Sequence, residues 1–323
     1  MYIDSAFGVQ LVLEFLHYGR LTYCSGTSYL DPLSLRGAFD LIINRRKIGT
    51  PHQVRNTPDF DSNNPAYVPS RTRFLLTRLL RIAIFYVIID FATSQVLVDP
   101  EKTFSADKVF FFDRVWRGEV SWLDAGIRIG QMAGAWIIGY WIQSMGHDIF
   151  SVLLVSLGLY QVKDCRPRFG NFWRSYTIRA FWGECWHQDF RWLLHQTASF
   201  VVLNVLQIPK EHKFLMKIVS LYMAFLVSGL IHLHADAISG IPYAESGAVT
   251  ATSMQAVAVL VEEMVQKAWG VKSGQCRRWH RIVGFVWTTA FLLWSAGYAQ
   301  FPLMRREQDF ALPVRFFKKQ ITA

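Results

Sequence analysis

The chain has 323 residues, of which 52% are hydrophobic and 18% are charged, and its formal net charge is +10. Soluble domains carry about 25% charged residues, and here the apolar residues gather in runs of about 15 to 23 residues, so the composition indicates a bilayer protein rather than a large soluble core. The basic residues flank these runs, as in loops that face anionic headgroups, which argues against nucleic-acid binding.

The four cysteines describe neither a zinc site nor a disulfide framework, because they show no CxxC or CxxH spacing. They are Cys24, Cys165, Cys185 and Cys276.

Residues 1–72 form a region that is expected to lie in loops and at the membrane interface. The short apolar stretch 6–18 is broken by Glu14, and turn-rich segments such as Asp31-Pro32 follow it. The first segment lacks the basic start of a signal peptide. Membrane insertion is therefore expected to depend on internal spans within residues 73–323.

The first predicted span covers residues 74–98 and carries Asp90 in its middle. A charge at a helix centre costs about 2.5–3.5 kcal/mol, so Asp90 should face protein or water, and a structural partnership is favoured over catalysis. Residues 100–126 are mixed in charge and are interpreted as a loop with an interfacial helix. Residues 127–162 are apolar enough for two helices broken near Gly146-His147-Asp148.

Four more apolar segments follow, at 192–208, 214–233, 247–266 and 282–304. The first of them is short and contains His195 and Asn204, so we expect it to be re-entrant or interfacial and to line a cavity. The predicted fold is an all-α, polytopic integral membrane helical bundle of about six to eight membrane helices around a central cavity.

One polar constellation lies in residues 181–192. If these residues form a helix, Trp182 and Trp186 share one side, and Glu184, His187 and Arg191 share another. The second side would present a histidine flanked by an acid and a base. An ordinary interfacial amphipathic helix explains the same spacing.

A second constellation ends the apolar run 214–233, where His232 has almost no polar neighbours in the sequence. An ionisable residue inside a span is a functional hypothesis by default, and a buried imidazole stays neutral and able to accept a proton. Asp236 follows at i+4 and is placed to orient the ring, whereas His234 points elsewhere. A helix-packing hydrogen bond is the alternative role for His232.

Several enzyme classes lack their motifs here. The nine histidines are dispersed without an HxxHH or HExxH cluster, so no metal is expected. Walker A, GxGxxG and GxSxG motifs are also absent. Without a serine elbow, a covalent enzyme intermediate is less attractive than direct transfer of a group from one substrate to the other.

Three motifs together resemble one family. They are FWG-x-x-WHQ-x-x-R at 181–191, SGLIH at 228–232 and RKIGT-x-x-Q-V-x-N at 46–56. The chain resembles, from about residue 40 to about residue 300, the membrane-bound O-acyltransferase superfamily and within it the wax-synthase-like branch, with a core at about 160–265.

The resemblance implies an acyl-CoA-dependent transferase of the endoplasmic reticulum membrane, without a metal. Fungal relatives acetylate terpenoid or meroterpenoid hydroxyls, so acetyl-CoA and a lipophilic alcohol are the expected substrates. By analogy His232 is the catalytic base and His187 takes the place of the second family residue.

The resemblance also suggests residues around these two histidines. The supporting set is Asp236, Glu184, Gln188, Arg191 and Trp186. The expected contacts of the CoA phosphates are Lys163, Arg166, Arg168, Arg174 and Arg179, whose alternative role is ordinary positive flanking of membrane spans.

The chain departs from the family at two points. Leu233 replaces the acid that often follows the histidine, and relatives usually have more membrane helices on the N-terminal side, so a compact member or a truncated one is expected. Two other activities stay open, a transporter or channel along Asp90, His147, Asp148 and His232, and a wax-ester synthase acting on long-chain alcohols. An inactive scaffold is the remaining reading.

Overall fold

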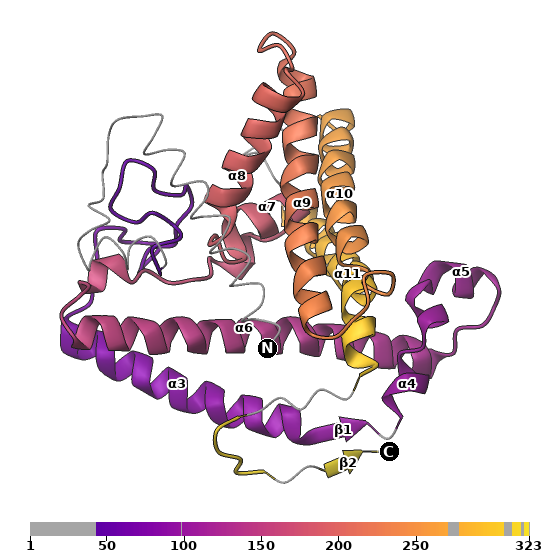
Figure 1. Ribbon diagram of the computed structural model, residues 1–323, viewed down its shortest axis with the longest axis horizontal. Helices are drawn as coiled ribbons and strands as arrows, with labels where there is room; N and C mark the ends of the chain where they lie inside the picture. The colour runs from indigo at the N-terminus through magenta and orange to yellow at the C-terminus, as the bar shows by residue number, and fades with distance from the viewer. Residues whose placement is uncertain (1–42, 98, 271–277, 307–311, 318–319, 323) are drawn as a thin grey trace. The chain divides into compact units, whose positions relative to one another are not determined.

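The computed structural model describes residues 43–97, 99–270, 278–306, 312–317 and 320–322 (Figure 1). The predicted apolar stretch 6–18, the Asp31-Pro32 turn, Cys24 and Cys276 lie outside these ranges. The chain divides into two compact units, which are described separately. Unit 1 comprises Met1–Pro58 and Phe169–Phe291, and unit 2 comprises Asp59–Arg168 and Leu292–Ala323. The predicted boundary at residue 72 stays a prediction.

Nearly all regular secondary structure of the described residues is helical, as the predicted fold class requires. Unit 2 contains α3 (Arg71–Ser94), β1 (Gln95–Leu97), α4 (Pro100–Thr103), η1 (Ala106–Val109), α5 (Phe111–Trp116), α6 (Trp122–Ser156), η2 (Val162–Asp164) and β2 (Gln320–Thr322). Unit 1 contains η3 (Phe172–Arg174), α7 (Ile178–Ala180), η4 (Phe181–Cys185), α8 (Arg191–Phe200), η5 (Val201–Val205), α9 (Lys213–Ile238) and α10 (Ala248–Ala268). Helix α11 (Arg278–Met304) contributes residues to both units.

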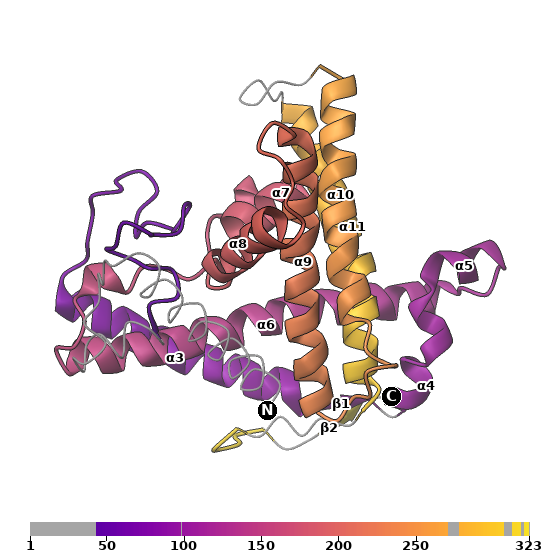
Figure 2. The same ribbon diagram turned by 45° about the horizontal axis from the view of Figure 1, so that its top comes forward.

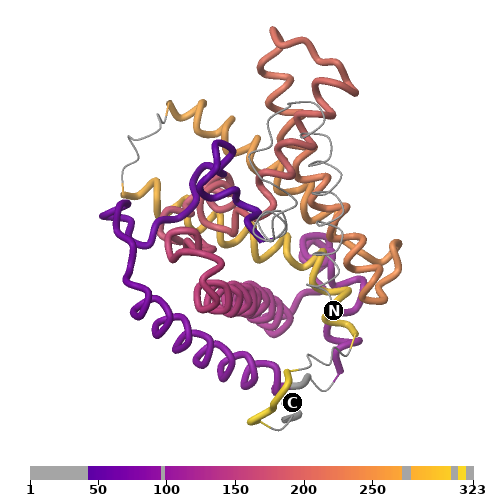
Figure 3. Tube along the Cα trace, turned by 60° about the vertical axis from the view of Figure 1, so that its left-hand side comes forward, coloured from indigo at the N-terminus to yellow at the C-terminus, as the bar shows by residue number. Residues whose placement is uncertain are grey.

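Helices α3 and α6 lie against each other in unit 2 (Figures 1 and 3). Two arginines of α3 meet one carboxylate of α6: Arg78 donates to Asp148, and the Arg81 Nε lies 3.3 Å from its second oxygen. Asp148 is fully buried. Because breaking such a pair leaves a charge without compensation, this contact holds the two helices in register.

The prediction of two helices broken near Gly146 was wrong, since α6 is continuous from Trp122 to Ser156. A glycine inside a helix costs only about 1 kcal/mol. The polar residues beside it have partners, with His147 Nε2 3.0 Å from the Arg166 carbonyl and Asp148 bound to α3. The helix therefore has no reason to break there.

Asp90 has the structural role that was favoured for it. It is fully buried near the end of α3 and accepts hydrogen bonds from the backbone N–H groups of Phe316 and Phe317 at 2.6 and 3.2 Å. Arg315 also approaches it at 3.3 Å. These contacts bring the C-terminal segment to α3, and beyond them β2 pairs in parallel with β1, Gln95 opposite Gln320.

In unit 1, α9 and α10 lie side by side (Figures 1 and 2). A Cβ at Gly229 of α9 would be 2.3 Å from the Thr252 hydroxyl and 2.9 Å from the Cα of Val249. Only glycine allows this approach. Helix α8 also packs on α9, through a cluster formed by Leu193 of α8 and by Ile231 and Ala235 of α9.

Three helices among the described residues are long and apolar enough to cross a membrane, namely α9, α10 and α11. They correspond to the predicted spans at 214–233, 247–266 and 282–304. The larger count of six to eight membrane helices stays a prediction. Residues 192–208 form the ten-residue α8 followed by a π-helical turn, η5.

Candidate active site

The 181–191 segment is not the single helix that its spacing predicted. A short helix, α7, leads into the π-helical turn η4, and Trp186 then leaves the turn in an extended conformation with φ −66° and ψ 151°. Helix α8 begins only at Arg191. Glu184, His187 and Arg191 therefore do not share a helix face, and Glu184 is exposed.

Two residues of the motif hold this turn in shape. Gln188 is buried and donates from Nε2 to the carbonyls of Trp182 and Trp186. Arg191 donates to the carbonyl of Gly183 and, at 2.8 Å, to the side-chain oxygen of Gln188. A π-helical turn leaves carbonyls without their usual i+4 donors, so these side chains supply the missing hydrogen bonds.

The turn is closed on its other side by Gly170. Its N–H donates to the Cys185 carbonyl at 2.8 Å, and a Cβ there would lie 2.0 Å from the Glu184 carbonyl oxygen. No other residue type fits without a shift of the backbone.

His187 lies among aromatic rings directly after the turn. Its ring centroid is 5.7 Å from those of Trp186 and Phe190, and 6.0 Å from Phe169 in an edge-to-face arrangement. Its Nδ1 is 3.9 Å from a carboxylate oxygen of Asp189. The ring is thus confined by apolar neighbours and has one acid beside it.

His232 lies half-buried on α9, next to the same cluster that receives α8. The ring of Phe190 neighbours His187, and its side chain packs against the cluster that contains Ile231, the residue before His232. The segments that carry the two motif histidines, 45 positions apart in the chain, therefore pack on each other in unit 1.

Asp236 is buried one turn after His232 and accepts a hydrogen bond from the Ser246 hydroxyl in the α9–α10 connection. His234 is exposed, and its Nδ1 lies 3.3 Å from the Tyr243 hydroxyl.

The predicted CoA-binding residues are divided between the two units. Lys163, Arg166 and Arg168 belong to unit 2, whereas Arg174 and Arg179 belong to unit 1. Three of them have protein partners: Arg166 pairs with Asp59 at 2.8 Å, Arg168 donates to Gln143 at 3.2 Å, and Arg179 pairs with Glu263 at 2.6 Å. Lys163 and Arg174 are exposed.

Residues 44–57, which we call the 44–57 loop, contact the 181–191 segment at several points. Asn56 donates to the Gly183 carbonyl at 3.0 Å, and the Arg46 Nε lies 3.8 Å from Asp189. Lys47 places its ammonium 4.8 Å from the centre of the Trp192 ring, a cation–π contact. Sequence reasoning noticed this loop only through family resemblance, and it assigned no site role to Arg46 or Asp189.

Glu262 of α10 is another residue that the sequence did not single out. Its buried carboxylate accepts hydrogen bonds from the N–H groups of Ile178 and Arg179 at 2.6 and 3.2 Å, and from Trp287 Nε1 at 2.9 Å. An acid at a helix start is stabilised by the free N–H groups there. Glu262 thereby ties α7 to α10 and α11.

Cys185 is fully buried within the turn, and burial raises the pKa of its thiol to about 11, against a smaller opposing effect of a hydrogen bond with Ser175. The thiolate is the reactive form of cysteine. At neutral pH this thiol is protonated, in keeping with direct transfer.

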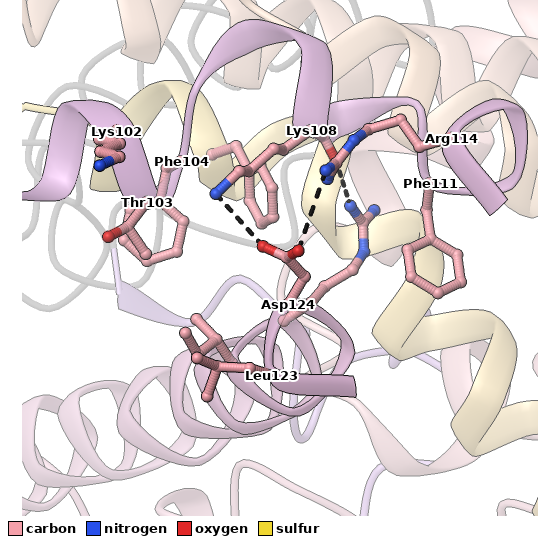
Figure 4. Close-up of a pocket in the computed structure, with 11 residues that line it drawn as sticks. Lys102, Thr103, Phe104, Lys108, Phe111, Arg114, Leu123 and Asp124 are labelled. Carbon is pink, nitrogen blue, oxygen red and sulfur yellow. Dashed lines mark hydrogen bonds and ion pairs between the residues drawn. The ribbon is translucent and has the colours of Figure 1, made fainter. Parts of the chain in front are cut away.

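Unit 2 has a separate basic hollow between α4, α5 and the start of α6 (Figure 4). The Asp124 carboxylate lies within it, 3.4 Å from Lys108 and 3.9 Å from Arg114. The guanidinium of Arg128 donates hydrogen bonds to the carbonyls of Lys108 and Trp294. Since these cations already have oxygen partners, the hollow is not a prepared anion site.

The described residues contain no group of three or more His, Cys, Asp or Glu side chains placed to hold a metal ion.

This helical chain, with three helices long and apolar enough to cross a bilayer among its described residues, is a membrane protein. A model of the Membrane bound O-acyl transferase family matches residues 165–254, a range that includes both histidines.

Curated relatives are similar over most of the chain. The chain is 31% identical over 274 residues to acetyltransferase ataH of Aspergillus terreus, which covers 83% of this chain and 89% of that protein. It is 30% identical to acetyltransferase pyr8 of Aspergillus fumigatus (86% of this chain, 66% of that protein). It is 27% identical to acetyltransferase cdmC of Talaromyces verruculosus (87% and 69%). No solved structure matches the chain.

The chain therefore belongs to the membrane-bound O-acyltransferase family, within its fungal secondary-metabolite acetyltransferase type, as the three motifs predicted. Family and relatives together support an acyltransferase activity.

Proposed function

We propose that this protein transfers an acetyl group from acetyl-CoA to the hydroxyl of a lipophilic small molecule. The observation that supports the proposal is that both motif histidines lie in unit 1, where Phe190 neighbours His187 and packs against the cluster that contains Ile231 of α9. The acetyltransferase relatives support acetyl as the acyl group and CoA as its carrier.

In the proposed reaction His232 acts as general base. Its neutral imidazole takes the proton of the acceptor hydroxyl while the hydroxyl oxygen attacks the thioester carbonyl carbon. The tetrahedral intermediate then collapses, the carbon–sulfur bond breaks, and the CoA thiolate takes the proton back from the imidazolium. The products are the acetyl ester and free CoA, with no acylated side chain.

His187 is proposed to donate a hydrogen bond to the thioester oxygen, which becomes negative in the transition state. Such a donor is most effective where water is excluded. The surrounding rings of Phe169, Trp186 and Phe190 support this proposal, because they leave a donor in an apolar setting. Gln188, Arg191 and Trp186 then support the site by shaping the turn before His187.

The acceptor is proposed to be a terpenoid or meroterpenoid alcohol, and the protein is proposed to reside in the endoplasmic reticulum membrane. The apolar surroundings of both histidines suit an apolar alcohol. For the CoA phosphates, Arg174 remains the proposed contact in unit 1, because it is exposed in the segment just before the motif that carries His187.

The proposal is tested with microsomes that carry the wild type, His232→Ala, His187→Ala or His234→Ala. Each receives labelled acetyl-CoA and a set of terpenoid alcohols, and labelled ester is measured against the amount of membrane protein. We expect His232→Ala to lose about 10²- to 10⁴-fold in rate and His187→Ala about 10²- to 10³-fold. His234→Ala is the matched control, because this exposed residue lies on the same helix, and it should keep wild-type labelling.

Equal labelling by wild type and His232→Ala would remove His232 as the base. Labelling only with long-chain acyl-CoA and fatty alcohols would favour a wax-ester synthase. Uptake of an unmodified alcohol into sealed vesicles, without ester formation, would favour a transporter.

A further inference from the structure

The acid nearest to His187 lies two positions after it, in the extended stretch between η4 and α8. Asp189 Oδ2 is 3.9 Å from His187 Nδ1. The side chains are only 12% and 11% exposed, so the two groups face each other away from bulk solvent. At low dielectric an interaction at this distance is far stronger than in water.

Asp189 is in turn approached by a residue that is more than 130 positions earlier in the sequence. Arg46 of the 44–57 loop places its Nε 3.8 Å from the other carboxylate oxygen, Oδ1, and its side chain is 5% exposed. A buried carboxylate without a cation would tend to take up a proton. Arg46 is the cation beside Oδ1 of Asp189, and the second oxygen, Oδ2, is the one nearer the imidazole.

The 44–57 loop is built to present Arg46 at this point. Asn44 hydrogen bonds both the N–H and the carbonyl of Ile48, at 2.7 and 2.9 Å, and Lys47 adopts a positive φ of 53°. Such a conformation is unfavourable for a non-glycine residue and persists only where the surroundings impose it. The contacts of Asn56 with Gly183 and of Lys47 with Trp192 fasten the loop to the segment that carries His187.

We propose that Asp189, held by Arg46, is the positioning residue for His187, and that Arg46, Asp189 and His187 form a buried relay. The carboxylate, 3.9 Å away, attracts the Nδ1–H of a doubly protonated imidazole and thereby fixes the ring orientation. The opposite N–H, at Nε2, is then the donor that serves the reaction. This inference rests on the proposed role of His187 and deepens it, because it assigns a function to the family motif at residues 46–56, which contains Arg46.

The inference is tested on the full chain in microsomes, with acetyl-CoA and an alcohol that the wild type acetylates. Asp189→Asn keeps the size of the side chain and removes its charge. We expect kcat to fall about 10- to 100-fold, as for other lost orienting partners, while the KM for acetyl-CoA stays within about twofold because CoA contacts are unchanged. Asp189→Glu, which keeps a carboxylate, should recover part of kcat.

Two further variants separate positioning from a merely structural role. Arg46→Met should lower kcat without a change in KM, and combining it with Asp189→Asn should cost no more than Asp189→Asn alone. Asp113→Asn is the matched control, because it removes an acid from an exposed Arg–Asp pair of α5 in unit 2. It should leave kcat and KM unchanged.

The outcomes distinguish this inference from the proposed function. If His187→Ala loses activity while Asp189→Asn and Arg46→Met keep wild-type kcat, the relay is wrong and the proposed function stands. If His187→Ala is fully active, the role of His187 and the relay fall together. If Asp189→Asn does not accumulate in the membrane, Arg46→Met and Asp189→Glu decide, and wild-type kcat in Arg46→Met overturns the relay.

Discussion

At the scale of single residues, the motif positions divide into those that can do chemistry and those that shape the chain. Gln188 and Arg191 are committed to backbone carbonyls of the π-helical turn, and Gly170 admits that turn's carbonyl at close range. His187 follows the turn with its ring beside those of Trp186 and Phe190. Most motif residues therefore shape the chain, and His187 is the one for which we propose a role in the reaction.

A glycine in α9 gives a residue-scale prediction. Gly229→Ala should destabilise the protein by about 1–3 kcal/mol, because its Cβ would lie 2.9 Å from the Cα of Val249, where α10 cannot move away without loss of packing. The thermal unfolding midpoint of the detergent-solubilised protein measures the change.

Gly139→Ala is the matched control. It is also a glycine inside a long helix, α6, and a Cβ there meets no atom within 4 Å. It should be neutral or stabilising by up to about 1 kcal/mol. Equal midpoints for the two variants would contradict the close approach of α9 and α10.

At the scale of elements, helical spacing alone failed twice, for opposite reasons. In α6, a glycine and two polar residues suggested a break, but tertiary partners for His147 and Asp148 made the continuous helix possible. In residues 181–191, a regular amphipathic pattern suggested a helix, but side-chain donors stabilised a π-helical turn and an extended Trp186. Both outcomes depend on partners that are distant in the sequence or local but not periodic.

Glu262 carries the element-scale prediction. Glu262→Gln should cost about 1–3 kcal/mol of stability, because an amide supplies one acceptor where the carboxylate serves three donors, from α7 and from Trp287 of α11. The adjacent Glu263→Gln is the control. Glu263 makes more exposed ion pairs with Arg179 and Lys217, which contribute about 0–1 kcal/mol.

The denaturation midpoints of both variants in detergent measure the two losses of stability. A larger loss for Glu263→Gln than for Glu262→Gln would show that the α7 anchor is not the important contact.

Three polar residues of unit 2 argue against the alternative that the protein is a transporter or channel. Asp90, His147 and Asp148 each bind groups of unit 2, namely the C-terminal backbone, the Arg166 carbonyl and the α3 arginines. Such committed groups serve helix packing, which is the role that the sequence favoured for Asp90.

At the scale of the whole molecule, α9 shows how the chain meets lipid. It is long and apolar enough to span a bilayer, and Leu215, Tyr222, Leu230 and Ile238 expose their side chains along it. An exposed apolar surface of this kind is stable only against lipid or another protein.

The whole-molecule prediction is that the protein stays in the membrane pellet after extraction with alkaline carbonate and leaves it only with detergent. Three apolar helices of 21 to 27 residues each exceed the length needed for about 30 Å of hydrocarbon. A peripheral microsomal protein, which carbonate releases, serves as the control. Recovery of this protein in the carbonate supernatant would contradict the spans.

The sequence by itself determined the class of molecule, because composition, run length and flanking charge depend on the bilayer and not on the fold. The sequence also determined the family, through the motifs at residues 181–191, 228–232 and 46–56. Tertiary structure alone decided the shape of the 181–191 segment, the continuity of α6 and the partners of Glu262. It also brought Arg46 to Asp189, and Phe190 to the cluster that contains Ile231 of α9. The physical reason is that these features arise from contacts between residues far apart in the chain, and no local period or composition encodes such contacts.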